Sequence, residues 1–356
     1  MKKLLLSACL IPLIVVAQNK YVVNNNPGAS ANFSSLQVAI NTVPAGSILY
    51  VMPGAFSYGD IVLNKSLTIY GTGFFLGQNL DPNTQANPAP AKVNSLWCKP
   101  GGDLSYIEGI QIFVENGSSN YAVRIDTVAN ITLSRCLIIC SVNPTGSIEM
   151  KGATNCVVKN CYIAPPNFIW PHAVLAGGDF SGIQFNNNII LNTGSYFYAN
   201  ASAGNGTASF TNNTIIAVMN GGTFGNFNYS NNIFVSQDAS PNVTVNSFNG
   251  ASMFNISNAA NLFTPAGNNL NSANTDSMFV SGLPGYHSVD EKWRVRDTSL
   301  AMTYGQGGIQ CGAYGTTDPY KLSGIPNLPY IYSMNVPSQA TAPGTIVVRI
   351  KAKASN

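Results

Sequence analysis

Charged side chains are scarce in this sequence. Of its 356 residues, 17 are Lys or Arg and 14 are Asp or Glu, which amounts to 9%. An ordinary soluble domain has about 25%. The formal net charge of +3 is too small, and the basic residues are too scattered, to make a nucleic-acid-binding surface. With 45% hydrophobic residues the chain still has the means to form a core.

Long apolar segments and metal ligands are scarce as well. Beyond the extreme N-terminus no apolar stretch is long enough for a spanning helix, so we predict no membrane span. The two histidines, His172 and His287, lie far apart, and no Cys-x-x-Cys accompanies them. We therefore predict neither a metal site nor a cofactor.

Residues 1–17 have the pattern of a secretory signal peptide. A positive start, Met1-Lys2-Lys3, precedes an apolar run from Leu4 to Val16. Lipid attachment at Cys9 is the alternative, but cleavage there would leave an apolar run of only three residues. We expect a secreted or cell-surface protein.

Asparagine is the residue in excess, with 44 copies against 31 charged residues. Many of them fall in a repeat of short apolar strands joined by polar steps, and no repeat contains a long helical pattern. A period of this length without helices is typical of a parallel β-helix, in which each coil stacks on the last. The repeats begin at residues 108, 135, 160, 187, 212, 231 and 260.

The second position of the repeat predicts a structural ladder. Residues one coil apart lie about 4.8 Å apart, and an amide both donates and accepts, so stacked copies bond one another. A row of amides that binds a ligand is the alternative. The predicted ladder consists of Cys136, Cys161, Asn188, Asn213, Asn232 and Asn261.

The same register predicts two ion pairs. Arg124 lies 25 residues before Glu149, and Asp126 lies 25 residues before Lys151. Opposite charges in register on a solvated sheet are cross-strand pairs of modest strength. The alternative is a catalytic pair of acids, Asp126 and Glu149, with basic helpers.

The opening of the chain resembles pectin-lyase-like right-handed β-helix proteins, in residues 34–41, 44–51 and 64–71. The resemblance implies an all-β, single-stranded right-handed parallel β-helix with a short N-terminal capping helix. We expect a signal peptide at 1–17, the β-helix with its cap at 18–317, and a β-strand extension at 318–356. Residues 305–315 and 318–326 are similar to the closing coil of uncharacterised secreted Bacteroidota proteins.

The catalytic groups of that family have no clear counterpart in this sequence. The motif of its pectin esterases has only a faint echo at residues 179–182, and its lyases need a base beside clustered acids. Between residues 152 and 289 the acids are Asp179, Asp238 and Asp276, which are too dispersed for either chemistry. We predict no catalytic residue.

Six cysteines remain after signal removal: Cys98, Cys136, Cys140, Cys156, Cys161 and Cys311. An even number in an exported protein permits disulfides, and buried thiols are an equal alternative.

Aromatic residues give the one positive indication of a ligand. They lie in or beside the broader loops, among glycine and asparagine, where exposed rings would suit stacking on a sugar. The alternative is that these rings alternate inward and fill the core. The candidates for glycan contact are Phe168, Trp170, Tyr196, Tyr198, Phe227 and Tyr229.

The C-terminus reads as two strands, at residues 330–336 and 345–353, and Arg349, Lys351 and Lys353 make one face of the second strand basic. We favour a cap over the last coil, since open β edges invite aggregation. The alternative is strand addition to another copy or to an outer-membrane protein.

Two function classes follow. The first is an exported non-catalytic β-helix that serves as a surface scaffold, adhesin or glycan-binding module, with polysaccharide as its partner. The second is a polysaccharide-active enzyme, a lyase, esterase or hydrolase, with an atypical site.

Overall fold

The computed structural model describes residues 18–79, 85–115, 121–141, 146–164, 172–175, 179–199, 206–245, 250–285, 287–339 and 344–354. At residues 172–175 and 193–196 it describes the backbone alone. The signal peptide predicted at residues 1–17 lies outside the described residues, as do Phe168 and Trp170.

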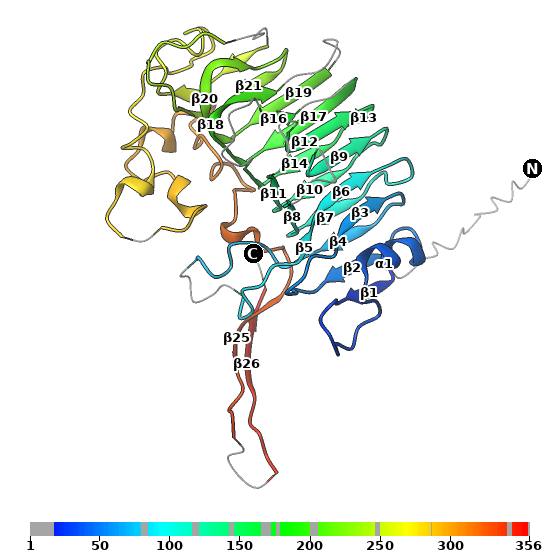
Figure 1. Ribbon diagram of the computed structural model, residues 1–356. Helices are drawn as coiled ribbons and strands as arrows, with labels where there is room; N and C mark the ends of the chain where they lie inside the picture. Colours follow the sequence, from blue (N-terminus) through cyan, green and yellow to red (C-terminus); the bar gives the residue numbers. More distant parts are fainter. Residues whose placement is uncertain are drawn as a thin grey trace, which may run out of the picture.

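Short strands wind into stacked coils, and in the described part of the chain they form three parallel sheets (Figure 1). The long sheet contains β1 (Lys20–Val23), β2 (Ile48–Val51), β4 (Thr68–Tyr70), β7 (Tyr106–Glu108), β10 (Thr132–Ser134), β13 (Ala153–Thr154), β14 (Val157–Lys159), β17 (Phe180–Asn186), β19 (Gly206–Thr211), β21 (Asn228–Ser230) and β23 (Ser252–Met253). The middle sheet contains β5 (Lys92–Val93), β8 (Gln111–Val114), β11 (Leu137–Cys140), β15 (Tyr162–Ile163), β16 (His172–Leu175), β18 (Ile189–Ala199), β20 (Thr214–Thr223), β22 (Ile233–Ser236) and β24 (Ile256–Ser257). The short sheet contains β3 (Asp60–Leu63), β6 (Ser95–Cys98), β9 (Val123–Asp126) and β12 (Ile148–Lys151). This confirms the predicted all-β, right-handed parallel β-helix.

A short helix, α1 (Leu36–Thr42), packs on the N-terminal end of the stack (Figure 1). The side chain of Ser35 accepts a hydrogen bond from the backbone N–H of Val38 and so caps the first turn. One face of the helix buries Leu36, Ala39 and Ile40 against the core. The helix therefore covers apolar surface that the first coil would otherwise expose, as the sequence predicts.

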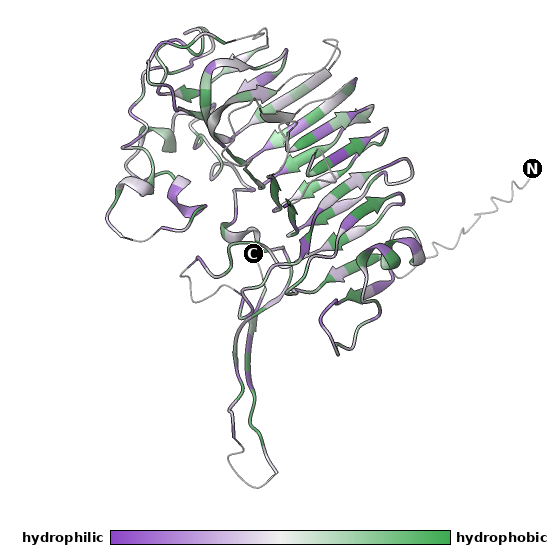
Figure 2. Cartoon of the chain, viewed as in Figure 1, coloured by the Kyte–Doolittle hydropathy of each residue, from purple (hydrophilic) through white to green (hydrophobic). Residues whose placement is uncertain are grey.

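Strand alternation fills the interior of the coils with apolar side chains. In Figure 2 the strands carry both hydrophobic and hydrophilic residues, because one face points inward and the other outward. Ile125 and Met150 point inward and are buried. In the later coils the rings of Phe185, Phe210 and Tyr229 stack with centroid separations of 4.6 Å and 5.0 Å.

Two of the six rings proposed for glycan contact belong to this core. Tyr229 is in register with Phe210, is 1% exposed, and donates its hydroxyl hydrogen to the backbone oxygen of Phe224. Phe227, also 1% exposed, packs against Phe180 and Phe210. The proposal was wrong for both residues, because strand alternation turns them inward.

The ladder is present, with one correction. The amide of Asn188 donates to Asn213 at 2.9 Å, and Asn213 donates to Asn232 at 3.0 Å. Cys161 and Cys136 continue the row on the N-terminal side: the backbone N–H of Cys161 donates to the Asn188 side chain, and that of Cys136 to the Cys161 sulfur. These contacts confirm the first five predicted members.

Asn261 does not belong to the ladder. Asn232 donates instead to Asn255 at 2.9 Å, and Asn255 donates to Asn269 at 2.9 Å. Asn261 is exposed in a loop, where its side chain accepts from the backbone N–H of Val243. The left-handed residue that precedes the ladder position in this coil is Phe254, so the turn comes six residues earlier than the sequence alignment predicted.

After the last coil the chain turns back along the stack. Three short 3-10 turns, η2 (Val280–Gly282), η3 (Glu291–Trp293) and η4 (Leu300–Met302), precede an extended segment, residues 305–327, that we call the strap. The strap includes the 3-10 turn η5 (Leu322–Gly324). It meets the side chain of Asn231 first, then that of Asn187, and later the backbone of Phe74.

Residues 305–315 are therefore not the closing coil that the sequence suggested, and the boundary expected at 317/318 falls inside the strap. The strap and the 3-10 turns cover the outer face of the middle sheet, whose strands are apolar on both faces. Tyr320 and Ala313 pack there on Leu137, Tyr162 and Ile216. A sheet with two apolar faces needs such a cover on each side.

The C-terminal strands form an antiparallel hairpin of β25 (Tyr330–Asn335) and β26 (Arg349–Lys353). Figure 1 shows it projecting from the early coils, far from β24 at the other end of the stack. It does not cover the last coil, so the cap that we favoured from the sequence was wrong.

Within the described residues no helix is long and apolar enough to cross a membrane.

Candidate functional site

A groove of about 680 Å³ lies on the outer face of the long sheet, across β7, β10, β14, β17 and β19. Its floor is made by side chains that alternate outward from the strands, and its wall by the strap. Its lining consists of Tyr106, Thr132, Val157, Lys159, Asn160, Gln184, Asn186, Asn187, Ser209, Thr211, Thr316 and Asp318.

The floor carries hydroxyl and amide groups in two parallel rows. One row runs along the register that contains Thr132, Gln184 and Ser209, and the other contains Asn186 and Thr211. Five strands span four strand spacings, or about 19 Å. Val157 interrupts the first row and Lys159 stands beside Asn186 in the second, and the other members present hydrogen-bond donors and acceptors along the stack.

The wall is held by a second series of polar residues, one before each ladder position. Asn160 and Asn187 have left-handed backbone angles, with φ of 55°, which asparagine tolerates better than most residues. Their side chains point outward and donate to the strap: Asn160 to the backbone oxygen of Pro319 at 2.8 Å, and Asn187 to that of Gly315 at 2.7 Å. These bonds fix the strap beside the floor.

The charged groups at the groove are paired. Lys159 on the floor lies 2.7 Å from Asp318 on the wall. Behind them Arg135 lies 3.2 Å from Glu108, and both side chains are buried. Burial raises the pKa of Glu108, and the nearby Arg135 opposes that shift. The groove therefore presents a nearly neutral surface to a ligand.

The Lys159–Asp318 pair predicts a pH-dependent contribution to stability. Partial burial alone would raise the pKa of Asp318, but the hydrogen bond from Lys159 and the charges of Lys159 and Arg135 hold it below its ordinary value. Because the folded pKa is depressed, the carboxylate stabilises the fold above the ordinary value of about 4, and that contribution is lost as the pH falls through the folded pKa.

We therefore expect Asp318→Asn to lower the free energy of unfolding at neutral pH by about 0.5 kcal/mol, a small value because the pair is half exposed. Below the folded pKa the variant and the wild type should converge. Urea unfolding of both proteins across the acidic range measures this difference, and a gap that does not change with pH would contradict the assignment.

A row of tyrosines extends the floor toward the N-terminal end. The rings of Tyr50 and Tyr70 stack at 5.9 Å, and Tyr70 meets Tyr106 edge to face at 6.1 Å. All three are half-buried, so part of each ring is open to solvent. Sequence reasoning missed them because the early coils differ in length, with 20 residues between the first two rings and 36 between the next two.

Among the other aromatic candidates, Tyr198 does not line this groove. Tyr198 is half-buried in β18 of the middle sheet, and Tyr196 lies in the same strand with its side chain outside the described part. Phe168 and Trp170 lie outside the described residues, so their glycan contact stays a prediction.

The outer face of the short sheet has the most charge. Arg124 and Glu149 are in register and 2.6 Å apart, which confirms the first predicted ion pair. Asp126 and Lys151 are in register too, but the ion pairs found among the described residues do not include them. Asp126 instead accepts from the hydroxyl of Thr127 at 2.9 Å, so the second pair is present in register only.

Trp97 lies in the same register as Arg124, whose guanidinium is 4.4 Å from the ring centroid, and Lys99 is 3.7 Å from it. The ring is thus in contact with two cations, and Glu149 is neutralised by Arg124. This arrangement supports a structural role for the charges over a pair of catalytic acids.

In the described residues there is no group of three His, Cys, Asp or Glu placed to hold a metal ion.

The six cysteines that the structure describes are buried thiols. Burial raises the pKa of Cys311 to about 12 and raises the pKa of Cys98, Cys156 and Cys161 as well. A nucleophilic cysteine needs a lowered pKa and access to solvent. These thiols fill the core and the ladder.

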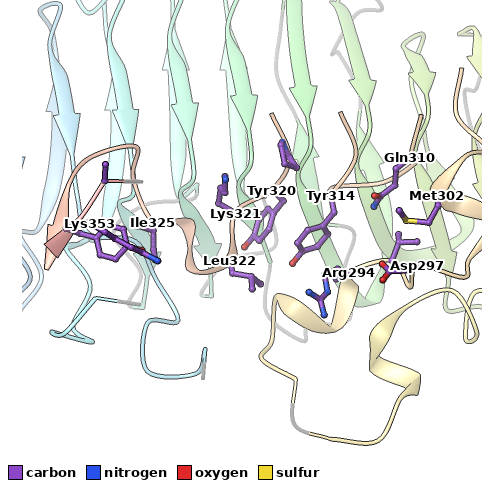
Figure 3. A pocket seen from close by; sticks show the side chains of 14 residues that line it. Arg294, Asp297, Met302, Gln310, Tyr314, Tyr320, Lys321, Leu322, Ile325 and Lys353 are labelled. Carbon is purple, nitrogen blue, oxygen red and sulfur yellow. The ribbon is translucent and has the colours of Figure 1, made fainter. Parts of the chain in front are cut away.

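A second hollow, of about 660 Å³, lies along the strap between residues 294–302 and the base of the hairpin (Figure 3). Its polar lining is largely engaged within the protein. The hydroxyl groups of Tyr314 and Tyr320 donate to the backbone and side chain of Asp290. In Figure 3 Lys353 lies at one end, apart from Arg294 and Asp297, so the charges do not converge on one point.

No protein-family model matches the chain, and no curated protein matches it. Among solved structures, jun a 1, the major allergen from cedar pollen, is 12% identical with a TM-score of 0.43, over 80% of this chain and 87% of that chain. Pectate lyase Pel9A is 12% identical with a TM-score of 0.43, over 84% and 97% of the two chains. A pectin methylesterase is 10% identical with a TM-score of 0.36, over 73% and 94%. The parallel sheets themselves establish the parallel β-helix, and likenesses this low carry nothing about activity.

Proposed function

We propose that this protein is an exported, non-catalytic β-helix that binds a neutral polysaccharide in the groove on the long sheet. The observation that carries the proposal is the floor of that groove, where amide and hydroxyl groups on neighbouring strands lie beside a row of tyrosine rings. Sugars are recognised by hydrogen bonds to their hydroxyl groups and by stacking on aromatic rings, and this surface supplies both.

The charges favour a neutral ligand over an acidic one. Lys159 is already paired with Asp318, and Arg135 with Glu108, so no cation at the groove is left to bind a carboxylate. A glycosidase would need two carboxyl groups facing the substrate. The carboxylate that lines the groove, Asp318, accepts from Lys159 and Asn160 instead, which supports binding without cleavage.

Two variants test the site. Gln184 is exposed on the floor, and Asn186 lies two residues further along the same strand. We expect Gln184→Ala and Asn186→Ala each to weaken glycan binding about fivefold, since a lost hydrogen bond contributes about 1 kcal/mol. Gln306→Ala is the control, because this exposed side chain lies outside the groove.

The measurement is a glycan array with the mature protein, followed by calorimetry on each neutral glycan that binds and by product analysis. Binding that both floor variants weaken, without new reducing or unsaturated ends, supports the proposal. Binding that is insensitive to both variants would place the site elsewhere, and new chain ends would show an enzyme.

A further inference from the structure

The C-terminal hairpin is amphipathic. In its register Met334 faces Ile350 and Ile331 faces Ala352 across the two strands, so these side chains share one apolar face. The opposite face carries the pairs Ser333–Lys351 and Asn335–Arg349. Met334 is 58% exposed and Ile350 is 56% exposed, so the apolar face is open to water.

Almost nothing in the described protein supports this hairpin from the side. At its base the backbone N–H of Ala86 donates to the oxygen of Ile331 at 2.9 Å, and beyond that point it projects away from the coils (Figure 1). A two-stranded hairpin alone is marginally stable in water, and exposed apolar patches of this kind mark interaction surfaces. The exposed apolar face of the hairpin therefore has the character of an interaction surface.

The charge pattern selects the way in which a second copy would pack. Joining two copies edge to edge through β26 would bring Arg349, Lys351 and Lys353 of one copy beside those of the other, which is unfavourable. Packing the two apolar faces against each other leaves all of these cations in water. An anionic bilayer is a poorer match, because the cations point away from the apolar face.

The area is sufficient for a dimer. Val336, Ile346 and Val348 extend the exposed apolar surface beyond the paired strands. Together with Met334, Ile350 and Ile331 they expose on the order of 600 Å² in each copy, or about 1,200 Å² for two, which clears the threshold of about 1,000 Å² for a stable interface. An apolar hollow of about 590 Å³ at the foot of the hairpin, lined in part by Met52, Pro88 and Leu328, continues the same surface onto the body.

We propose that the protein forms a two-fold dimer in which the apolar faces of the two C-terminal hairpins pack against each other. Because the same patch serves both copies, the interface is self-complementary and the assembly closes at two chains.

Sedimentation equilibrium of the mature protein over the micromolar range tests this inference. We expect the mass of two chains for the wild type and of one chain for Met334→Asp combined with Ile350→Asp. The matched control is Ser333→Asp combined with Lys351→Asp, which changes a facing pair on the opposite side of the same hairpin and should remain dimeric. Circular dichroism and the melting temperature show that the coils of each variant are intact.

A wild type that is monomeric throughout the range would overturn the proposal. Equal dissociation of both double variants would overturn it too, since the apolar face would then have no special role. Flotation with phosphatidylglycerol vesicles, together with a monomeric mass, would assign the face to a bilayer instead.

Discussion

Replacing Asn213 by leucine is expected to lower the free energy of unfolding by about 4 kcal/mol. Its amide nitrogen donates to Phe185 and Asn232, and its oxygen accepts from the backbone and side chain of Asn188, all in a fully buried position. Leucine has a similar size, so a cavity contributes little to the lost free energy of unfolding. Most of the loss comes from the buried polar groups that leucine leaves without a hydrogen-bond partner. Each buried group left without a partner costs about 1 to 3 kcal/mol.

Asn261→Leu is the control for this variant. Asn261 has the same residue type and was predicted from the sequence to occupy the same ladder, but it is exposed and accepts a single hydrogen bond from Val243. We expect it to cost less than about 1 kcal/mol. Equal losses for the two variants in urea unfolding would show that the ladder does not stabilise the coils.

Asp290→Asn is expected to cost about 3 kcal/mol. One carboxylate oxygen accepts from the backbone N–H of Ser323 at 2.7 Å and from the hydroxyl of Tyr320 at 3.2 Å. The other accepts from Ser288 at 2.9 Å and from the side chain of Asn79 at 3.3 Å. An amide in this position keeps one acceptor but points two N–H groups at existing donors.

This residue joins three distant segments, so its loss should have a local signature as well. The strap leaves the coils when its anchor at Ser323 is weakened, and trypsin should then cleave sooner after the half-buried Lys321. Asp297→Asn, at an exposed carboxylate, is the control and should cost less than about 0.5 kcal/mol. Loss of stability without faster cleavage would mean that Asp290 does not hold the strap.

The sequence predicted the ladder correctly from Cys136 to Asn232, although the steps between members, 25, 27, 25 and 19 residues, differ in length. From Cys136 to Asn232 each member follows the last by one full coil, so the alignment of repeats brings them together. Asn255 follows Asn232 by 23 residues, which lies within the range of the earlier steps, and Asn269 follows after 14 more. Asn261 was chosen because two apolar residues follow it, as in the other repeats, whereas Asn255 is followed by Ile256 and a serine.

Two of the aromatic candidates, Phe227 and Tyr229, were wrong for a different reason. Phe227 and Tyr229 are two residues apart and therefore share a face, but the sequence does not show which face points inward. Packing decides this: the ring of Tyr229 completes a stack that begins with Phe185 and Phe210. The groove was missed because its wall depends on contacts between residues more than a hundred positions apart, such as Asn187 with Gly315.

The strap also changes how the coils are expected to unfold. A stack of repeats that contacts only its neighbours loses its end repeats one at a time. Here a single segment is bonded to the early coil at Phe74, to the central coil at Asn160 and to the late coil at Asn231. The coils from Phe74 to Asn231 share this one segment, and we expect them to unfold together as one cooperative unit.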